Sequence, residues 1–171
     1  MLRRFTLIRL VVFGMLLALA GSPGAQETAT LGPVTNLPLP RFVSLKADNG
    51  YIRRGPSQSH RIDWILTRKG TPLLVTAEFE HWRRVQDEDG AGGWMHYALL
   101  SGHRTVVVRA QRAPLRKTPT ESAATVALVE KGVIGSLGAC TIDWCEIEVE
   151  NISGWIPKSE IWGVGATEIR E

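Results

Sequence analysis

The strongest constraint on this chain of 171 residues is that it contains one segment twice. The first copy runs from Tyr51 to Gly102 and the second from Pro114 to Gly163. The landmarks recur in the same order, at an offset that drifts from 63 to 61 residues: Ile52-Arg53-Arg54 with Leu115-Arg116-Lys117, Gly70 with Gly132, Trp82 with Trp144, and Gly93-Trp94-Met95 with Gly154-Trp155-Ile156. Because an internal repeat fixes the architecture, the sequence predicts two similar domains in tandem.

Each copy has the pattern of short β-strands. Runs of four to six residues rich in Val, Ile, Thr and Trp alternate with turn signals such as Asp48-Asn49-Gly50 and Lys69-Gly70. This spacing is typical of small barrels. We therefore expect an all-β protein with two tandem small barrels at residues 41–103 and 104–165, and a C-terminal tail at 166–171. The short apolar join Val106-Val107-Val108 predicts that the two barrels pack against each other.

The N-terminus has the pattern of a secretory signal. Arg3, Arg4 and Arg9 precede an apolar run, Leu10 to Ala20, which is too short to span a bilayer as a stable helix. We expect a signal peptide at residues 1–25, with an uncleaved anchor as the alternative. Residues 26–40, rich in proline, are predicted to form an extended tether. The protein is then exported, to the periplasm or cell envelope, and does not span the membrane after cleavage.

The charge balance argues against nucleic-acid binding. The whole chain has 20 Lys+Arg and 17 Asp+Glu, a net charge of +3. Residues 1–25 hold three arginines and no acid, so the remaining chain has 17 of each sign. Nucleic-acid binders usually carry a clear basic excess. The high pI therefore reflects the targeting segment, and no nucleic-acid partner is expected.

The two cysteines, Cys140 and Cys145, are separated by four residues. In an exported protein this spacing favours a disulfide across a hairpin turn, worth about 2 kcal/mol on the loop-entropy model. Two free thiols and half of a zinc site are the alternatives, although a zinc site needs four ligands. The four histidines lack metal-ligand spacing. We expect no metal, no cofactor and no catalytic residues.

The motifs of the two repeated segments resemble those of the bacterial Src-homology-3-like (SH3b-type) domain. Its pattern of an Asn-Val-Arg-like strand, a Gly-Pro turn, a Gly, a Trp-x-x-Val strand and Gly-Trp-Val is matched twice between Arg41 and Gly163. The matching motifs of the first copy are Ile52-Arg53-Arg54-Gly55-Pro56-Ser57, Gly70, Trp82-Arg83-Arg84-Val85 and Gly93-Trp94-Met95-His96. The usual Asn is Tyr51 in the first copy and Pro114 in the second. The resemblance implies two SH3-like barrels of non-catalytic character, usually found in exported, wall-associated proteins.

The tryptophans and their neighbours supply the candidate ligand-binding residues. Alternation places Trp144 on the polar face of its strand, where it either contacts a ligand or caps the end of the barrel. Trp94 and Trp155 are expected in the core. The unrepeated Trp64 and Trp162 either fill the interface between the barrels or mark a site specific to one copy. An aromatic and basic groove in the first barrel would consist of Tyr51, Arg53, Arg54, Trp64 and Trp82.

Two functions follow as expectations. The first is an exported, non-catalytic module that binds peptidoglycan or cell-wall peptides. The alternative is an envelope scaffold that contacts proteins, and recruits or regulates a wall enzyme without touching the wall. A hydrolase is disfavoured because the two barrels leave no room for a catalytic domain, and a disulfide would remove the thiolates.

Overall fold

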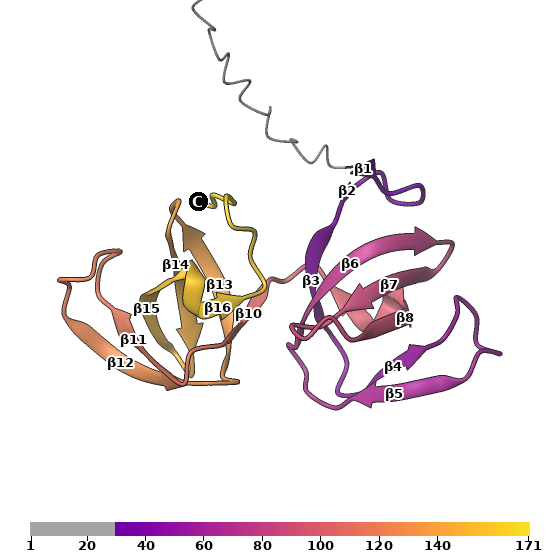
Figure 1. Cartoon of the computed structure of the whole chain (residues 1–171), viewed down its shortest axis with the longest axis horizontal. Helices are drawn as coiled ribbons and strands as arrows, with labels where there is room; N and C mark the ends of the chain where they lie inside the picture. Colours follow the sequence, from indigo (N-terminus) through magenta and orange to yellow (C-terminus); the bar gives the residue numbers. More distant parts are fainter. Residues whose placement is uncertain (1–29) are drawn as a thin grey trace, which may run out of the picture.

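The computed structural model describes residues 30–171, which form two β-domains side by side (Figure 1). The predicted signal peptide, residues 1–25, and the start of the predicted tether lie outside the described residues. Within residues 30–171, no helix has the length and apolar character needed to cross a bilayer. The prediction of an all-β fold with two tandem small domains is confirmed.

The first domain, barrel 1, is a seven-stranded sheet whose paired strands all run antiparallel, in the order β5-β4-β8-β7-β6-β3-β9. Its elements are β3 (Arg41–Leu45), β4 (Gly50–Arg53), β5 (Ile62–Leu66), β6 (Pro72–Phe79), β7 (Trp82–Gln86), β8 (Gly92–His96), the 3-10 helix η1 (Tyr97–Leu99) and β9 (Leu100–Ser101). Its core is formed by the inward side chains of these strands, chiefly Leu45, Ile52, Leu73, Val75, Val85 and Met95.

The second domain, barrel 2, repeats this topology strand for strand, in the order β12-β11-β15-β14-β13-β10-β16. Its elements are β10 (Thr105–Val108), β11 (Arg112–Arg116), β12 (Thr125–Glu130), β13 (Ile134–Cys140), β14 (Trp144–Val149), β15 (Ile152–Pro157), the 3-10 helix η2 (Lys158–Glu160) and β16 (Ile161–Trp162). A separate core contains Val106, Val108, Leu115, Cys145, Ile147 and Ile156. The repeat seen in the sequence is therefore a repeat of the sheet.

The expectation that Trp94 and Trp155 lie in the core is wrong. The fully buried residues are their neighbours, Met95 and Ile156, each 0% exposed, whereas both tryptophans are half-buried. The preceding glycines determine which side chains face the core. A Cβ on Gly93 would lie only 2.6 Å from the Arg53 carbonyl oxygen, so no larger residue fits at this inward position. Glycine faces inward where two strands approach closely, so the tryptophan that follows it points outward.

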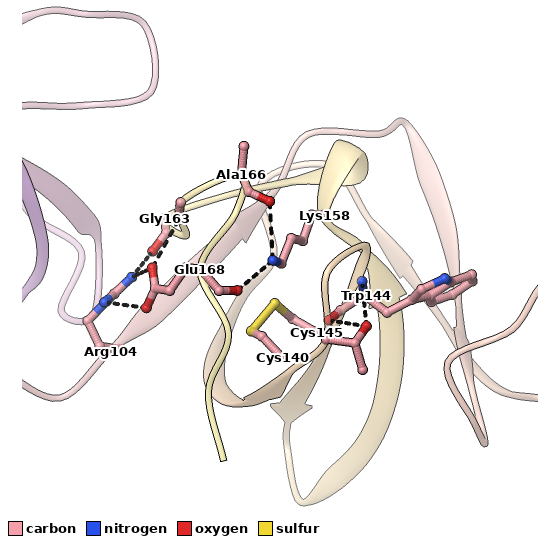
Figure 2. Close-up of a disulfide and its surroundings, with 10 residues drawn as sticks. Arg104, Cys140, Trp144, Cys145, Lys158, Gly163, Ala166 and Glu168 are labelled. Carbon is pink, nitrogen blue, oxygen red and sulfur yellow. Dashed lines mark hydrogen bonds and ion pairs between the residues drawn. A yellow bond between two sulfur atoms is a disulfide. The ribbon is translucent and has the colours of Figure 1, made fainter. Parts of the chain in front are cut away.

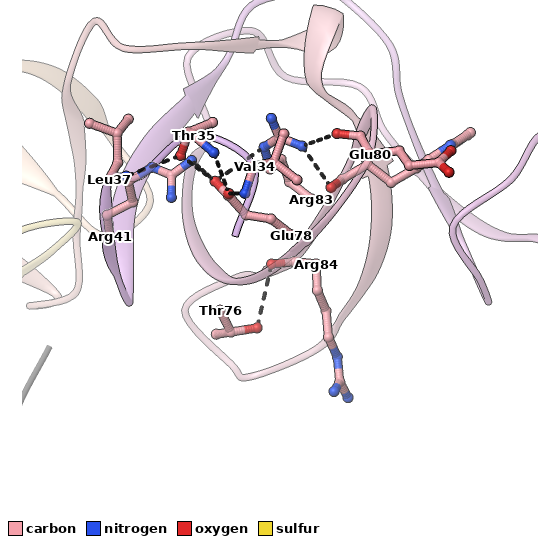
Figure 3. Close-up of polar contacts among 10 residues, drawn as sticks. Val34, Thr35, Leu37, Arg41, Thr76, Glu78, Glu80, Arg83 and Arg84 are labelled. Carbon is pink, nitrogen blue, oxygen red and sulfur yellow. Dashed lines mark hydrogen bonds and ion pairs between the residues drawn. The ribbon is translucent and has the colours of Figure 1, made fainter. Parts of the chain in front are cut away.

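Residues 30–40 do not form the predicted extended tether. Two short strands, β1 (Thr30–Leu31) and β2 (Pro38–Leu39), pair antiparallel as a hairpin, and Leu39 is buried against the core of barrel 1. The carboxylate of Glu78 on β6 accepts hydrogen bonds from the backbone N–H groups of Val34 and Thr35 and from the Thr35 hydroxyl (Figure 3). The proline content of this segment does not predict that it packs on the barrel. Glu78, the residue that holds it, lies more than forty residues away in the sequence.

The C-terminal segment also folds back onto its barrel. Arg104 pairs with Glu168 at 3.0 Å, and Lys158 Nζ donates to the Glu168 carbonyl at 2.6 Å (Figure 2). Backbone hydrogen bonds in both directions join Arg170 to Cys140. The predicted tail at 166–171 is thus a packed part of barrel 2.

The two barrels contact each other, as the apolar join predicts. The hydroxyls of Ser44 and Thr105 are 2.6 Å apart and buried, and the Thr105 hydroxyl donates to the Gly70 carbonyl. The ring of Phe42 packs edge-on against Trp162, with 5.1 Å between ring centroids. Of the two predicted roles for Trp162, a position at the interface between the barrels is therefore confirmed.

Candidate functional site

Barrel 1 has a pocket of about 220 Å³ on its outer face. It combines aromatic, basic and neutral side chains from β4, β7, β8, η1 and the loop after β4: Tyr51, Arg53, Gln58, Trp82, His96 and Leu99. Tyr51 and Arg53 share a face of β4 because they are two residues apart. Three of the predicted groove residues, Tyr51, Arg53 and Trp82, therefore meet in one place.

The floor of the pocket is held in position by aromatic packing. Trp82 is opposite His96 in the β7–β8 register, and their rings meet edge-on, with centroids 5.4 Å apart. Nδ1 of His96 accepts a hydrogen bond from the Ala98 N–H, which fixes the orientation of the imidazole. The Tyr97 ring lies 4.9 Å from that of His96 and has the Arg83 guanidinium 5.8 Å from its centroid. A fixed tryptophan suits ligand binding, since little side-chain freedom is lost when a ligand docks.

Arg53 has a structural task as well as a place in the pocket. Its Nη1 donates to the carbonyls of Gln58, at 3.0 Å, and His60, at 2.7 Å, and so ties down the loop between β4 and β5. Within residues 30–171, no carboxylate lies within ion-pair distance of Arg53. Its guanidinium is therefore fixed in position without a neutralising partner.

The other two predicted groove residues do not line this pocket. Arg54 is exposed and lies 3.6 Å from Asp63, whose pKa is lowered mainly by its hydrogen bond from Arg61. Trp64 is opposite Ile52 on the edge strand β5 and is 39% exposed. The groove predicted from the sequence therefore divides, with Arg54 and Trp64 outside the pocket.

The sequence-based prediction missed Gln58, His96 and Leu99 as pocket residues. His96 could have been found from the hairpin that contains the acidic turn Asp87-Glu88-Asp89-Gly90. Counting outward from this turn along both strands places His96 opposite Trp82. Gln58 lies in a loop whose fold depends on Arg53, and Leu99 follows a strand end. No periodic signal in the sequence marks these two residues.

Barrel 2 carries the equivalent tryptophan, Trp144, in a larger pocket of about 470 Å³. The pocket is lined by the disulfide turn, the loop after β11, η2 and the C-terminal segment: Glu121, Ile142, Asp143, Trp144, Pro157, Lys158, Ser159, Val164 and Ala166. Trp144 is half-buried, and its backbone N–H donates to the Thr141 hydroxyl. The aromatic ring stays on the outer face, as alternation predicts.

The predicted disulfide is present, between Cys140 and Cys145 (Figure 2). It joins β13 to β14 at paired positions next to the hairpin turn. Within residues 30–171, no group of three or more His, Cys, Asp or Glu residues is arranged to hold a metal ion.

Comparison with solved structures finds similarity to NlpC2 and NlpC1 from Trichomonas vaginalis and to an NlpC/P60 family protein from Bacillus cereus ATCC 10987. Sequence identities are 10%, 11% and 14%, with TM-scores of 0.34, 0.35 and 0.32. The matches cover 72%, 77% and 71% of this chain and 48%, 48% and 55% of those chains. The chain thus spans about half the length of these structures. No curated protein matches it.

The family comparison returns the bacterial SH3 domain twice, over residues 46–102 and 109–163. The two segments cover more than half of the chain, and each coincides with most of one seven-stranded sheet. The chain therefore belongs to the bacterial SH3 domain family, of which it contains two tandem copies.

Proposed function

We propose that this protein is an exported, non-catalytic module of the bacterial cell envelope that binds peptidoglycan or wall peptides at the pocket of barrel 1. The observation that carries the proposal is the fixed Trp82 beside the half-exposed Tyr51 and an arginine without a carboxylate partner. Tryptophan, tyrosine and arginine are the residues that most often dominate binding energy. Export is inferred from the signal-like pattern of residues 1–25.

The non-catalytic part of the proposal is supported by the chemistry of the cysteines. Nucleophilic catalysis by cysteine needs a thiolate, and Cys140 and Cys145 are joined to each other. Membership of a family of small barrels agrees with a binding role, although function depends on the site and not on the fold.

The test is co-sedimentation of the mature chain, residues 26–171, with purified peptidoglycan sacculi. We expect saturable binding, weakened about 30-fold by Trp82→Ala, as for a central aromatic contact. Because Trp82 is only 8% exposed, its loss also affects folding, so Tyr51→Ala, at a half-exposed position, is the second variant. Trp64→Ala is the matched control outside the pocket. Absence of binding at any salt concentration would overturn the proposal.

A protein partner is the second candidate function, and one feature favours it. The edge strand β5 exposes Ile62, Trp64 and Ile65, which are 38%, 39% and 48% exposed. Apolar residues on an open sheet edge suit pairing with a strand of another protein. If this function holds, Trp64→Ala and Ile65→Asp abolish capture of an envelope protein, while Tyr51→Ala does not affect it.

A further inference from the structure

The two barrels hold an arginine in the same place by the same means. Arg53 on β4 is opposite Trp94, and Arg116 on β11 is opposite Trp155. As Arg53 does with His60, Arg116 donates through Nη1 to a loop carbonyl, that of Ala123, at 2.9 Å. The fold therefore presents one guanidinium at the outer face of each barrel.

The loops that these arginines fix have the same conformation. In the first, the hydroxyls of Ser57 and Ser59 are 2.6 Å apart and the Ser59 N–H donates to Ser57. In the second, Thr120 and Ser122 make the same two contacts, with 2.9 Å between the hydroxyls. The residue between each pair is Gln58 in barrel 1 and Glu121 in barrel 2. Gln58 and Glu121 thus occupy equivalent positions in the two loops.

In barrel 2 the equivalent arginine, Arg116, has two acidic neighbours, Glu121 and Glu160. Arg116 Nη2 lies 3.4 Å from Glu121 Oε2. Glu160, the last residue of η2, has a buried Oε2 with no hydrogen-bond partner among the described residues. Burial raises the pKa of Glu160, as does the charge of Glu121, while the charge of Arg116 opposes both. Two carboxylates therefore share the neighbourhood of one guanidinium.

In barrel 1 both acidic positions are neutral. Gln58 replaces Glu121, and Leu99, the last residue of η1, replaces Glu160. Both line the pocket with Arg53. Within residues 30–171, the hydrogen bonds of Arg53 use only Nη1, which leaves Nε and Nη2 on one edge of the guanidinium for a ligand. That edge matches the two oxygens of a carboxylate.

We propose that the pocket of barrel 1 binds a carboxylate group through Arg53, and that Glu121 and Glu160 close the equivalent site of barrel 2 to anions. The inference rests on the proposed function, and it specifies the chemical group of the wall peptide that is recognised. Trp82 and Tyr51 then contact the apolar part of the residue that carries the carboxylate. The residue at position 58 determines specificity. A neutral glutamine leaves Arg53 free to pair with a ligand carboxylate, whereas a glutamate would itself pair with the arginine.

The test compares two small probes, N-acetyl-D-alanyl-D-alanine with a free carboxylate and the same dipeptide as its C-terminal amide. Binding is followed by NMR titration of the backbone amide signals of the mature chain. We expect the acid to shift signals of β4 and β8, with the amide binding at least about tenfold more weakly. Added salt should weaken the binding of the acid and not that of the amide, because screening acts on charge pairs.

The decisive variant is Gln58→Glu, which copies the arrangement of barrel 2. Arg53→Ala is a less specific test, because it would also release the loop that Arg53 holds. Gln58→Glu avoids this problem, because the fold already accommodates a glutamate at the equivalent position of barrel 2. We expect Gln58→Glu to weaken binding of the acid by about tenfold and to weaken binding of the amide much less. Gln58→Ala, which removes the side chain without adding a charge, should weaken binding of the acid less than Gln58→Glu does. The reciprocal double variant Glu121→Gln with Glu160→Leu should create carboxylate binding in barrel 2.

The outcomes separate this inference from the proposed function. Equal binding of acid and amide, no shift with the acid at millimolar concentration, or no effect of Gln58→Glu would overturn carboxylate recognition, even if sacculi still bind. Binding of the acid without binding of sacculi would support the carboxylate site and overturn the wall-binding proposal. Failure of both would overturn both.

Discussion

The two barrels close the same hairpin with different chemistry. Glu78 and Arg83 are opposite each other in the β6–β7 register, with 3.5 Å between Arg83 Nε and Glu78 Oε1. Cys140 and Cys145 are opposite each other in the equivalent β13–β14 register and form the disulfide. Both pairs are separated by four residues and lie next to the hairpin turn. A buried ion pair in barrel 1 thus occupies the position of a covalent bond in barrel 2.

Each of these pairs also anchors a segment that flanks its barrel in the sequence. The Glu78 carboxylate, whose side chain is 0% exposed, binds residues 34–35 and Arg41 (Figure 3). Cys140 instead pairs through its backbone with Arg170. One structural task, fixing the hairpin and a segment that flanks the barrel, is thus met by charge in one copy and by a covalent bond in the other. The two barrels should therefore fail under different conditions.

The largest expected effect is that of Glu78→Ala. The substitution leaves Arg41 and Arg83, 18% and 8% exposed, without their shared carboxylate, and it removes the acceptor for residues 34–35. Breaking a buried ion pair in this way costs about 3–5 kcal/mol. We expect hydrogen exchange to show this loss in barrel 1 and in residues 30–40, with barrel 2 little changed.

The matched control for that variant is Glu130→Ala in barrel 2. Glu130 also pairs with an arginine, Arg112, but both side chains are more than half exposed, and such pairs contribute at most about 1 kcal/mol. Equal losses for the two variants, or a loss spread over both barrels, would show that Glu78 does not have the role assigned to it.

Much of the fold could be predicted from the sequence because it depends on local patterns. The repeat, the turn signals and the short strands define two barrels, and the apolar join between them predicts that they pack together. The position of the disulfide follows from its spacing within one hairpin. Trp94 shows the limit of such patterns, because its orientation depends on how closely β8 crosses β4, which periodicity does not report.

The candidate site was predicted only in part, and for a physical reason. Tyr51, Arg53 and Trp82 belong to the repeat, so their positions follow from the fold. Whether a charged residue is available or neutralised depends on loop contacts, such as that between Arg116 and Glu121. The role of Glu78 was missed because its partners come from a segment whose prolines suggested a tether.

A smaller effect, about 3 kcal/mol, is expected from acid. Burial raises the pKa of Glu78, but hydrogen bonds from the Thr35 side chain and backbone, Arg41 and Val34 outweigh it and lower the pKa from 4.5 to about 2. A carboxylate with a lowered pKa in the folded state contributes stability above its unfolded pKa, and this is lost as the pH falls from about 4.5 to about 2. Barrel 1 should therefore unfold first in acid.

Two carboxylates of barrel 2 act in opposite directions and in adjoining pH ranges, Glu160 above the ordinary pKa of 4.5 and Glu168 below it. The pKa of Glu168 is raised by burial but lowered overall by its hydrogen bond from Arg104, whereas that of Glu160 is raised by burial. Protonation therefore removes stability at Glu168 and adds stability at Glu160. Hydrogen exchange of β6–β7 and β13–β14 between pH 5 and 2 measures the difference, and earlier opening of barrel 2 would contradict it.

The smallest expected effect is that of opening the disulfide. The bridge closes a loop of few residues, so Cys140→Ser with Cys145→Ser should cost about 2 kcal/mol on the loop-entropy model. The cost should appear only in barrel 2, and most clearly in the pairing of Cys140 with Arg170. A reductant should reproduce the exchange pattern of this double variant. Added to the Glu78→Ala protein, it should leave barrel 1 no less stable than before. If reduction instead loosens barrel 1 as much as barrel 2, the buried interface at Ser44 and Thr105 couples the barrels, and the two closing pairs stabilise one cooperative unit.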